Sequence, residues 1–234
     1  METLTIVLPV HNEKDTIEHV LREWTEMLQS HDDIQNQFII CEDGSTDGTK
    51  ELLKKIKDKY NLILNQKEGR RGYGGAVMDG IKDATSTYIL SLDSDGQCDP
   101  NDFSKFWKRR DEADIAIGWR VNRADSIHRK IYSKSFKTFF KMLFPNKLHD
   151  PSAPFVLYKK STIFPHLDQL TYLKEGFWWG FIGMAVKNNL SLLELPINHK
   201  LRHSGETQVY HFKKITSIAY RNLKGLVKLK FSKN

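Results

Sequence analysis

Two aspartates and a glutamine stand at alternate positions directly after an apolar run in the middle of the chain. They are Asp93, Asp95 and Gln97, in the sequence DSDGQ. In an extended segment, side chains at alternate positions point the same way, so the spacing predicts that all three converge on one point. Two carboxylates and an amide oxygen are hard ligands that suit Mg²⁺ or Mn²⁺ rather than zinc. A second interpretation stays open, namely a polar turn that ends a strand and caps a helix at Asp99 or Asn101.

The residues around this segment exclude several common ligand-binding loops. An EF-hand loop requires glycine at its sixth position and glutamate at its twelfth, where this chain has Cys98 and Ser104. The glycine-rich segment GRRGYGGA (69–76) lacks the Gly-Lys-Ser/Thr ending of a Walker A loop. Val77 stands where a dinucleotide fingerprint has its third glycine. These calcium, P-loop and dinucleotide sites are therefore excluded.

The elements that must position these residues alternate regularly over the first 120 residues. Apolar, β-branched runs predict strands at 5–10, 38–41, 61–66, 87–93 and 114–120. Helical spacing predicts helices at 15–30 with Asp15 as N-cap, at 49–60, within the segment 69–84, and near 101–112. This order predicts an α/β fold with a mostly parallel, doubly wound sheet flanked by helices.

Polar clusters follow three of the expected strands directly. They are HNE (11–13), EDGSTDG (42–48) and DSDGQ (93–97). Because ligands bind outside the carboxyl ends of the strands in such a sheet, we expect these three loops to share one edge.

The second half of the chain has a looser pattern. We expect a helix around the aromatic sequence GFWWGF (176–181), a strand at 190–197, and basic amphipathic segments near 127–144 and 211–230. In the last segment one apolar stripe is predicted, formed by Ile215, Ile218, Ala219, Leu223, Leu226 and Val227.

Size, charge and cysteine content limit the possible classes of protein. The 234 residues suffice for one sizeable domain, and the net charge of +7 favours an anionic partner: nucleic acid, a phosphorylated substrate or an acidic membrane surface. Only two cysteines occur, which favours a reducing cytosol over a disulfide framework. The start of the chain does not match a signal peptide, and the apolar run GFWWGFIGMAV covers about half of a membrane span. A nucleic-acid-binding module is disfavoured because three acidic loops at one edge would repel a polyanion.

Four motifs in order resemble a known family. LPVHNE (8–13), EDGSTDGT (42–49), GRRGYGGAVMDGI (69–81) and DSDGQ together look like the inverting family 2 glycosyltransferases of GT-A fold. Within that family, DSDGQ, DPSAPFVLYKKS (150–161) and ELPINHKLRHSGET (194–207) resemble the polyprenyl-phosphate sugar transferases of the dolichyl-phosphate mannose synthase kind.

This resemblance implies a donor site made from the loops after the strands. Asp43 hydrogen-bonds the base or ribose, Ser94 adjoins the ribose, and Arg71 is a further candidate for the base pocket. The residues that line the nucleotide pocket are Pro9, Val10, His11 and Glu13.

The resemblance also implies a metal and phosphate centre. Asp93 and Asp95 hold Mg²⁺ or Mn²⁺ against the donor diphosphate, and Gln97 assists them. Arg120 and Arg202 match positions that contact phosphates. A metal and arginines spread the charge of a nucleoside diphosphate leaving group.

The acceptor implied by the resemblance is a polyprenyl phosphate. The second pKa of a phosphate lies near 6, so its oxygen attacks as an anion and no general base is required. Two segments depart from the family pattern: Pro154-Phe155-Val156 replaces a Gly-Phe-Arg, and Thr207-Gln208 replaces a Ser-Lys. The alternative acceptor, a sugar hydroxyl of a glycan or glycolipid, requires a base, for which Glu175 is the candidate. An exposed glutamate at a helix start, favoured by the helix dipole, is the more ordinary interpretation of that residue.

We therefore expect a metal-dependent glycosyltransferase that moves a hexose from a UDP- or GDP-sugar. The GT-A domain is expected at 1–208, with a nucleotide-sugar half at 1–120 and an acceptor half at 121–208, followed by a basic amphipathic helix at 209–234. The expected location is cytoplasmic, and the basic segments suggest peripheral contact with the membrane face. Core-facing helices with solvated lysines explain the same spacing. A nucleotidyltransferase is a further alternative, which would cleave a nucleoside triphosphate at its α-phosphate.

Overall fold

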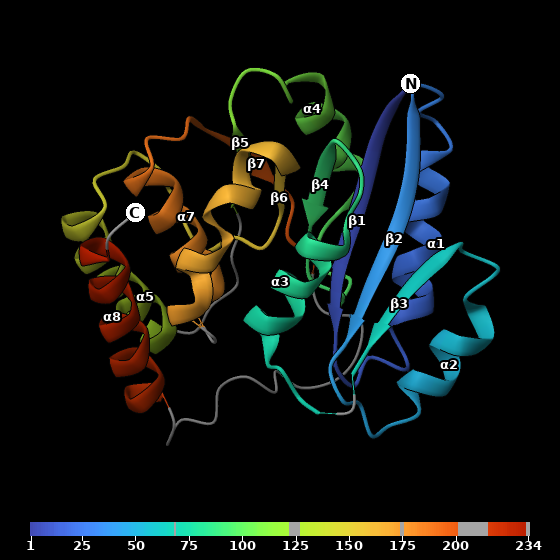
Figure 1. Ribbon diagram of the computed structural model, residues 1–234, viewed down its shortest axis with the longest axis horizontal. Helices are drawn as coiled ribbons and strands as arrows, with labels where there is room; N and C mark the ends of the chain where they lie inside the picture. The colour runs from blue at the N-terminus through green and yellow to red at the C-terminus, as the bar shows by residue number, and fades with distance from the viewer. Residues whose placement is uncertain (68, 122–126, 174–175, 201–214, 233–234) are drawn as a thin grey trace.

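Strands and helices alternate along the first 120 residues, as expected (Figure 1). The computed structural model describes residues 1–67, 69–121, 127–173, 176–200 and 215–232. In the first half the elements are β1 (Glu2–Val10), α1 (Ile17–Leu28), β2 (Ile34–Glu42), α2 (Thr49–Ile56), β3 (Leu62–Gln66), α3 (Tyr73–Asp83), β4 (Tyr88–Ser91), the 3₁₀ helix η1 (Pro100–Asp102), α4 (Phe103–Lys108) and β5 (Ile115–Arg120).

The second half contributes two further strands and most of the helices on one face. Its elements are α5 (Ile127–Leu143), β6 (Val156–Lys159), α6 (Lys160–Ile163), the 3₁₀ helix η2 (Phe164–Tyr172), α7 (Phe177–Lys187), β7 (Leu192–Ile197) and α8 (Ile215–Phe231).

Within the described residues the strands form one seven-stranded sheet in the order β3-β2-β1-β4-β6-β5-β7. β6 runs antiparallel to both of its neighbours, and every other pairing is parallel. The predicted mostly parallel, doubly wound α/β fold is confirmed. Because β6 is reversed, its first residue, Val156, lies opposite Ser91 at the end of β4. The start of β6 therefore lies at the same edge as the ends of the parallel strands.

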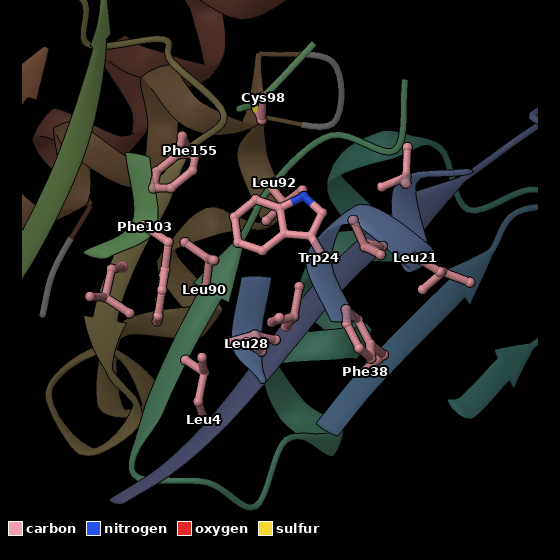
Figure 2. Packing of buried hydrophobic residues seen from close by; sticks show 14 of the residues in the cluster. Leu4, Leu21, Trp24, Leu28, Phe38, Leu90, Leu92, Cys98, Phe103 and Phe155 are labelled. Atoms are coloured by element: carbon pink, nitrogen blue, oxygen red, sulfur yellow. The ribbon is translucent and has the colours of Figure 1, made fainter. Parts of the chain in front are cut away.

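Alternating apolar residues along the strands supply two cores, one on each face of the sheet. In β1, Leu4, Ile6 and Leu8 face α1, α2 and α4, whereas Val7 belongs to the opposite core. Trp24 of α1 lies at the centre of the first core, among Leu90 of β4, Leu92 just after it, and the rings of Phe103 and Phe155 (Figure 2).

The second core lies between the sheet and α3, α5, α7 and α8. Helix α3 approaches β1 and β2 closely at Gly80. A Cβ added there would collide with the side chain of Val7 and would meet the sulfur of Cys41 at 2.8 Å. Glycine at this position therefore sets the distance between α3 and the sheet.

Several predicted boundaries were wrong. Helix α1 begins at Ile17, and Thr16 rather than Asp15 occupies its N-cap position, without a side-chain capping bond. Helix α2 ends at Ile56, and the expected helix at 101–112 is η1 followed by the six-residue α4. The strand expected at 87–93 ends at Ser91, so DSDGQ lies entirely outside the strand.

Helix α8 packs against α7 through a stripe that differs from the predicted one. Leu226 and Leu229 are fully buried in the second core, and Ile218 is also buried. Val227, which was expected in the stripe, is instead 38% exposed. The predicted domain boundary at residue 208 lies outside the described residues and stays a prediction.

Candidate active site

Three polar loops meet at the carboxyl edge of the sheet, because β2, β1 and β4 are neighbours. Backbone and side-chain bonds join the strand ends: Asp43 N donates to Val10 O at 2.9 Å, and Ser94 Oγ donates to Pro9 O at 2.8 Å. The expectation that the three loops share one edge is confirmed. Ser94 is 5% exposed and uses its hydroxyl to hold the loop after β4 against β1.

The loop after β1 is locked to the loop after β2. Asn12 adopts a positive φ of 56°. Its backbone N–H donates to Ser45 Oγ at 2.9 Å, and its side-chain oxygen accepts from Thr46 N at 2.8 Å. Glu13 N donates to Thr49 Oγ1 at 3.0 Å at the start of α2. This places His11 and Glu13 beside the edge where the nucleotide pocket is expected.

The pKa of His11 is lowered from its ordinary value. Burial disfavours the charged imidazole, and the neighbouring Arg70 lowers the pKa further, although nearby carboxylates oppose both effects. His11 is therefore a neutral ring at neutral pH, which suits stacking or hydrogen bonding more than phosphate neutralisation.

Asp43 fixes the glycine-rich segment. Its two carboxylate oxygens accept hydrogen bonds from Arg71 N at 2.5 Å and from Gly72 N at 3.0 Å, and Arg70 Nε lies 3.6 Å away. Gly72 has φ of +76°, a conformation that L side chains rarely adopt. Asp43 is 3% exposed, so it shapes the pocket wall through the 70–72 backbone.

The guanidinium of Arg71 is occupied by bonds within the protein. Nη1 donates to Asn65 Oδ1 at 2.6 Å and to Asp79 Oδ2 at 2.7 Å. Nη2 donates to the carbonyls of Glu42 at 2.8 Å and Asn65 at 3.2 Å. Arg71 therefore joins the ends of β2 and β3 to α3, a structural role that the sequence did not reveal.

The DSDGQ segment is a turn, and the predicted extended geometry is wrong. Gly96 has φ of +75°, and Gln97 N donates to Asp95 Oδ1 at 3.1 Å across the bend. Gln97 Nε2 donates to Lys200 O at 3.1 Å, which ties this side chain to the segment after β7. The role of Gln97 in metal binding stays a prediction. Asp99 caps η1 by accepting from Asn101 N at 3.1 Å, as the alternative interpretation predicted.

The segment after β7 holds this turn in place. Lys200 N donates to Gln97 O at 2.9 Å, and Cys98 pairs with His199 in an antiparallel bridge. Asn198 N donates to Asp102 Oδ2 at 2.6 Å. The turn that carries Asp93 and Asp95 is thus held on one side by the end of β1 and on the other by the segment after β7.

Arg120 lies at the end of β5 and is held by a partner that sequence reasoning missed. Its Nε donates to Asp150 Oδ2 at 2.7 Å and its Nη2 to Asp150 Oδ1 at 3.0 Å. Burial opposes its charge, but the hydrogen bonds and charge of Asp150 outweigh that effect and raise the pKa, with a further contribution from Asp93. A largely buried, permanently charged guanidinium therefore stands close to the DSDGQ turn.

Asp93 has a second partner that was not anticipated. Its Oδ1 accepts a hydrogen bond from the hydroxyl of Tyr73 at 2.6 Å, and Trp178 Nε1 donates to that same hydroxyl at 2.7 Å. Tyr73 lies in the glycine-rich motif and Trp178 in the aromatic helix, but nothing in either pattern signals their contact. Only the packing of α7 against α3 brings them together.

The donor set fits a hard divalent ion that also binds a ligand. Among the described residues, no group of three or more His, Cys, Asp and Glu side chains is arranged to hold a metal. Asp93 and Asp95 supply two carboxylates, and Mg²⁺ is commonly bound by one or two carboxylates together with substrate phosphates. Glu175 and Arg202 lie outside the described residues, so their roles stay predictions.

A model described as Glycosyl transferase family 2 matches residues 5–164. That match spans more than half of the chain. The chain therefore belongs to the family 2 glycosyltransferases, as its motifs predicted, and it is an enzyme of the glycosyltransferase class.

Solved structures share the fold at low sequence identity. Mannosyl-3-phosphoglycerate synthase from Rubrobacter xylanophilus has a TM-score of 0.67 at 13% identity, over 97% of this chain and 73% of that one. Glucosyl-3-phosphoglycerate synthase from Mycobacterium tuberculosis, in complex with phosphoglyceric acid, has a TM-score of 0.68 at 14% identity, over 100% and 81%. TarS 1–349 of S. aureus, in complex with UDP-GlcNAc, has a TM-score of 0.62 at 17% identity, over 97% and 67%. These similarities support the GT-A fold.

Within the ranges that the structure describes, no helix is both long and apolar enough to cross a bilayer.

Proposed function

We propose that this chain transfers a hexose from a UDP- or GDP-sugar, with inversion, to the phosphate of a polyprenyl phosphate. The observation that carries the proposal is the position of Asp93 and Asp95 in a fixed turn at the carboxyl edge, close to the buried Arg120. Carboxylates beside a guanidinium suit a diphosphate with a bound metal ion, because the carboxylates can hold the metal and the guanidinium can neutralise the phosphate oxygens.

The donor is proposed to lie across the ends of β2, β1 and β4. Pro9, Val10, His11 and Glu13 form one wall, and Asp43 forms the other through the backbone that it holds. Solved complexes of proteins with this fold support a nucleotide-sugar donor: the mycobacterial synthase was solved with Mn²⁺ and UDP, and TarS with UDP-GlcNAc.

In the proposed reaction, Asp93 and Asp95 would hold a divalent ion, which would supply positive charge to the diphosphate. Arg120 would add a second positive charge there, and its pair with Asp150 keeps the guanidinium in one orientation. Ser94 holds the turn against β1, so the position of the two carboxylates is fixed relative to the sheet. Transition-state stabilisation is then mainly electrostatic and preorganised.

A phosphate acceptor suits this site because it brings its own negative charge and needs no base. The mycobacterial neighbour, solved in complex with phosphoglyceric acid, shows that this fold accommodates a phosphate-bearing ligand in that protein. A glycan or glycolipid hydroxyl remains the alternative acceptor, with Glu175 as its candidate base.

The outer face of α8 supports peripheral contact with an anionic membrane. Tyr220, Val227 and Phe231 lie on one side of the helix and are 66%, 38% and 76% exposed. Exposed Arg221 and Lys224 flank them, and α8 contains no acidic residue. Apolar side chains among cations are the pattern of a helix that lies in the headgroup region.

Vesicle sedimentation tests this contact. We expect binding to phosphatidylglycerol-containing vesicles but not to pure phosphatidylcholine, and about tenfold weaker binding when Tyr220 and Phe231 are both changed to serine. Phe164→Ser is the control, because it removes a 49% exposed aromatic ring from η2 instead. Equal binding of the double variant and the control contradicts the proposed surface.

Turnover with a defined acceptor tests the function. The purified protein is incubated with labelled UDP- and GDP-hexoses, Mn²⁺ and a polyprenyl phosphate, and glycolipid formation is measured. Asp95→Asn should lose nearly all turnover while keeping its thermal midpoint, and the exposed Asp32→Asn should behave as wild type. Transfer only to free sugars or glycans rejects the lipid acceptor. Full activity of Asp95→Asn at limiting metal rejects the metal assignment.

A further inference from the structure

A chain of two hydrogen bonds connects the aromatic helix α7 to the carboxylate of Asp93. Trp178 Nε1 donates to the hydroxyl oxygen of Tyr73 at 2.7 Å, and that hydroxyl donates to Asp93 Oδ1 at 2.6 Å. The three residues come from α7, α3 and the loop after β4.

The chemistry of the groups fixes the direction of both bonds. An indole N–H can only donate, so the phenol oxygen of Tyr73 must accept from Trp178. The single phenol proton is then available only to Asp93, whose carboxylate accepts it. A phenol is protonated at neutral pH, so the hydroxyl of Tyr73 is a donor to Asp93.

The donor end of this chain is held rigidly. Trp178 is 5% exposed and packs edge-on against Phe177 and Phe181, with ring centroids 5.0 and 5.4 Å away. Its indole therefore has little freedom to rotate, and it presents its N–H to Tyr73 from a fixed position.

We propose that Tyr73 and Trp178 are positioning residues that orient the Asp93 carboxylate toward the metal and the donor diphosphate. The inference rests on the proposed metal-binding role of Asp93 and adds the groups that hold it. A carboxylate without such a partner rotates about its terminal torsion, which is broad. Outer-shell hydrogen bonds to metal ligands typically contribute 10–100-fold in metal affinity or activity.

The two residues are expected to act in series. Trp178 makes its bond to Tyr73, so its influence on Asp93 passes through the phenol, whose proton it makes a stronger donor by polarisation. Removing the indole N–H should therefore matter only while the Tyr73 hydroxyl is present, a non-additivity that a double-mutant cycle measures.

Metal binding to the intact protein tests the proposal without turnover. Free Mn²⁺ is measured by electron paramagnetic resonance during titration of the protein in the presence of saturating UDP. Tyr73→Phe should weaken Mn²⁺ binding roughly 10–100-fold, and Trp178→Phe should weaken it less. The double variant should match Tyr73→Phe alone.

Tyr88→Phe is the matched control. Tyr88 is a buried tyrosine whose hydroxyl donates to a carboxylate, Asp111 Oδ1, at 2.8 Å, but at the opposite end of β4. This variant should bind Mn²⁺ as wild type does. Thermal midpoints identify any variant that does not fold. If Tyr73→Phe does not fold, the smaller decrease in Mn²⁺ affinity expected for Trp178→Phe becomes the test.

The outcomes separate the two hypotheses. Wild-type affinity in a folded Tyr73→Phe protein overturns the positioning role while leaving the metal site intact, and so does an equal loss in Tyr88→Phe. If Tyr73→Phe does not fold, unchanged affinity in Trp178→Phe overturns it. A wild-type protein that binds no Mn²⁺ with any nucleoside diphosphate overturns the proposed function together with this inference.

Discussion

Replacing Arg71 with alanine should destabilise the protein far more than it weakens donor binding. The guanidinium satisfies the carbonyls of Glu42 and Asn65 and pairs with Asp79, and its side chain is only 11% exposed. Without it, both carbonyls lose a partner and Asp79 keeps only its bond to Lys67 at 2.6 Å.

The size of the effect follows from the bonds that are lost. The pair with Asp79 is only part-buried, so the main loss is at the two carbonyls, where an unsatisfied buried acceptor costs about 1–3 kcal/mol. In a domain of this size each kcal/mol lowers the thermal midpoint by roughly 2–4 °C, so a decrease of about 10 °C is expected. Arg71→Lys keeps a charge near Asp79 but loses the fork that reaches both carbonyls, so its stability should lie between wild type and alanine.

Urea unfolding and calorimetry of Arg71→Ala, together with UDP titrations at a temperature where the variant is folded, provide the assay. Arg109→Ala is the control, because Arg109 pairs with Glu112 at the surface and its loss should change stability little. An Arg71→Ala protein with a wild-type midpoint and greatly weakened UDP binding would refute the reasoning and restore Arg71 to the base pocket.

Three further predictions follow from the packing and the titratable groups. Gly80→Ala should destabilise the protein by about 1–3 kcal/mol in urea unfolding, because its methyl group collides with Val7. Neither thiol should react with a disulfide reagent at pH 8 until the protein unfolds, because burial raises the pKa of Cys41 to about 12 and that of Cys98 well above its ordinary value. Stability should fall as the pH decreases below about 6.5, because the unfolded state then binds a proton that folded His11 resists, and His11→Asn should reduce this dependence.

The arrangement of Asp93, Asp95 and the loops after β1 and β2 could be predicted from sequence because it depends only on element order. Parallel strands place their carboxyl ends at one edge, whatever the details of packing. The orientation of the Gln97 side chain could not be predicted, because the positive φ at Gly96 bends the segment and the amide nitrogen then donates to Lys200 O. The alternate spacing predicts convergence only for an extended segment, which the chain does not form here.

Long-range partners were beyond the reach of sequence patterns for a different reason. Tyr73 and Trp178 are 105 residues apart, and Arg120 and Asp150 are 30 apart. Their contacts depend on how α7 and the start of β6 pack, which hydrophobic periodicity does not specify. The same periodicity predicted a helix at α8 but wrongly placed Val227 in its buried stripe. Val227 lies at the edge of that stripe, where residue spacing alone does not separate buried positions from exposed ones.

The reversed direction of β6 has a consequence for how new specificities can arise on this scaffold. Because β6 enters the sheet from the edge that carries the site, the segment that leads into it ends beside Arg120, where Gly118 N donates to Phe155 O at 2.8 Å. Its register is fixed by β4 and β5 and not by the length of the preceding segment. Variation is therefore easiest at exposed positions of this segment such as Pro145 and Lys147, whereas Asp150 and Phe155 are constrained because they hold Arg120 and fill the first core.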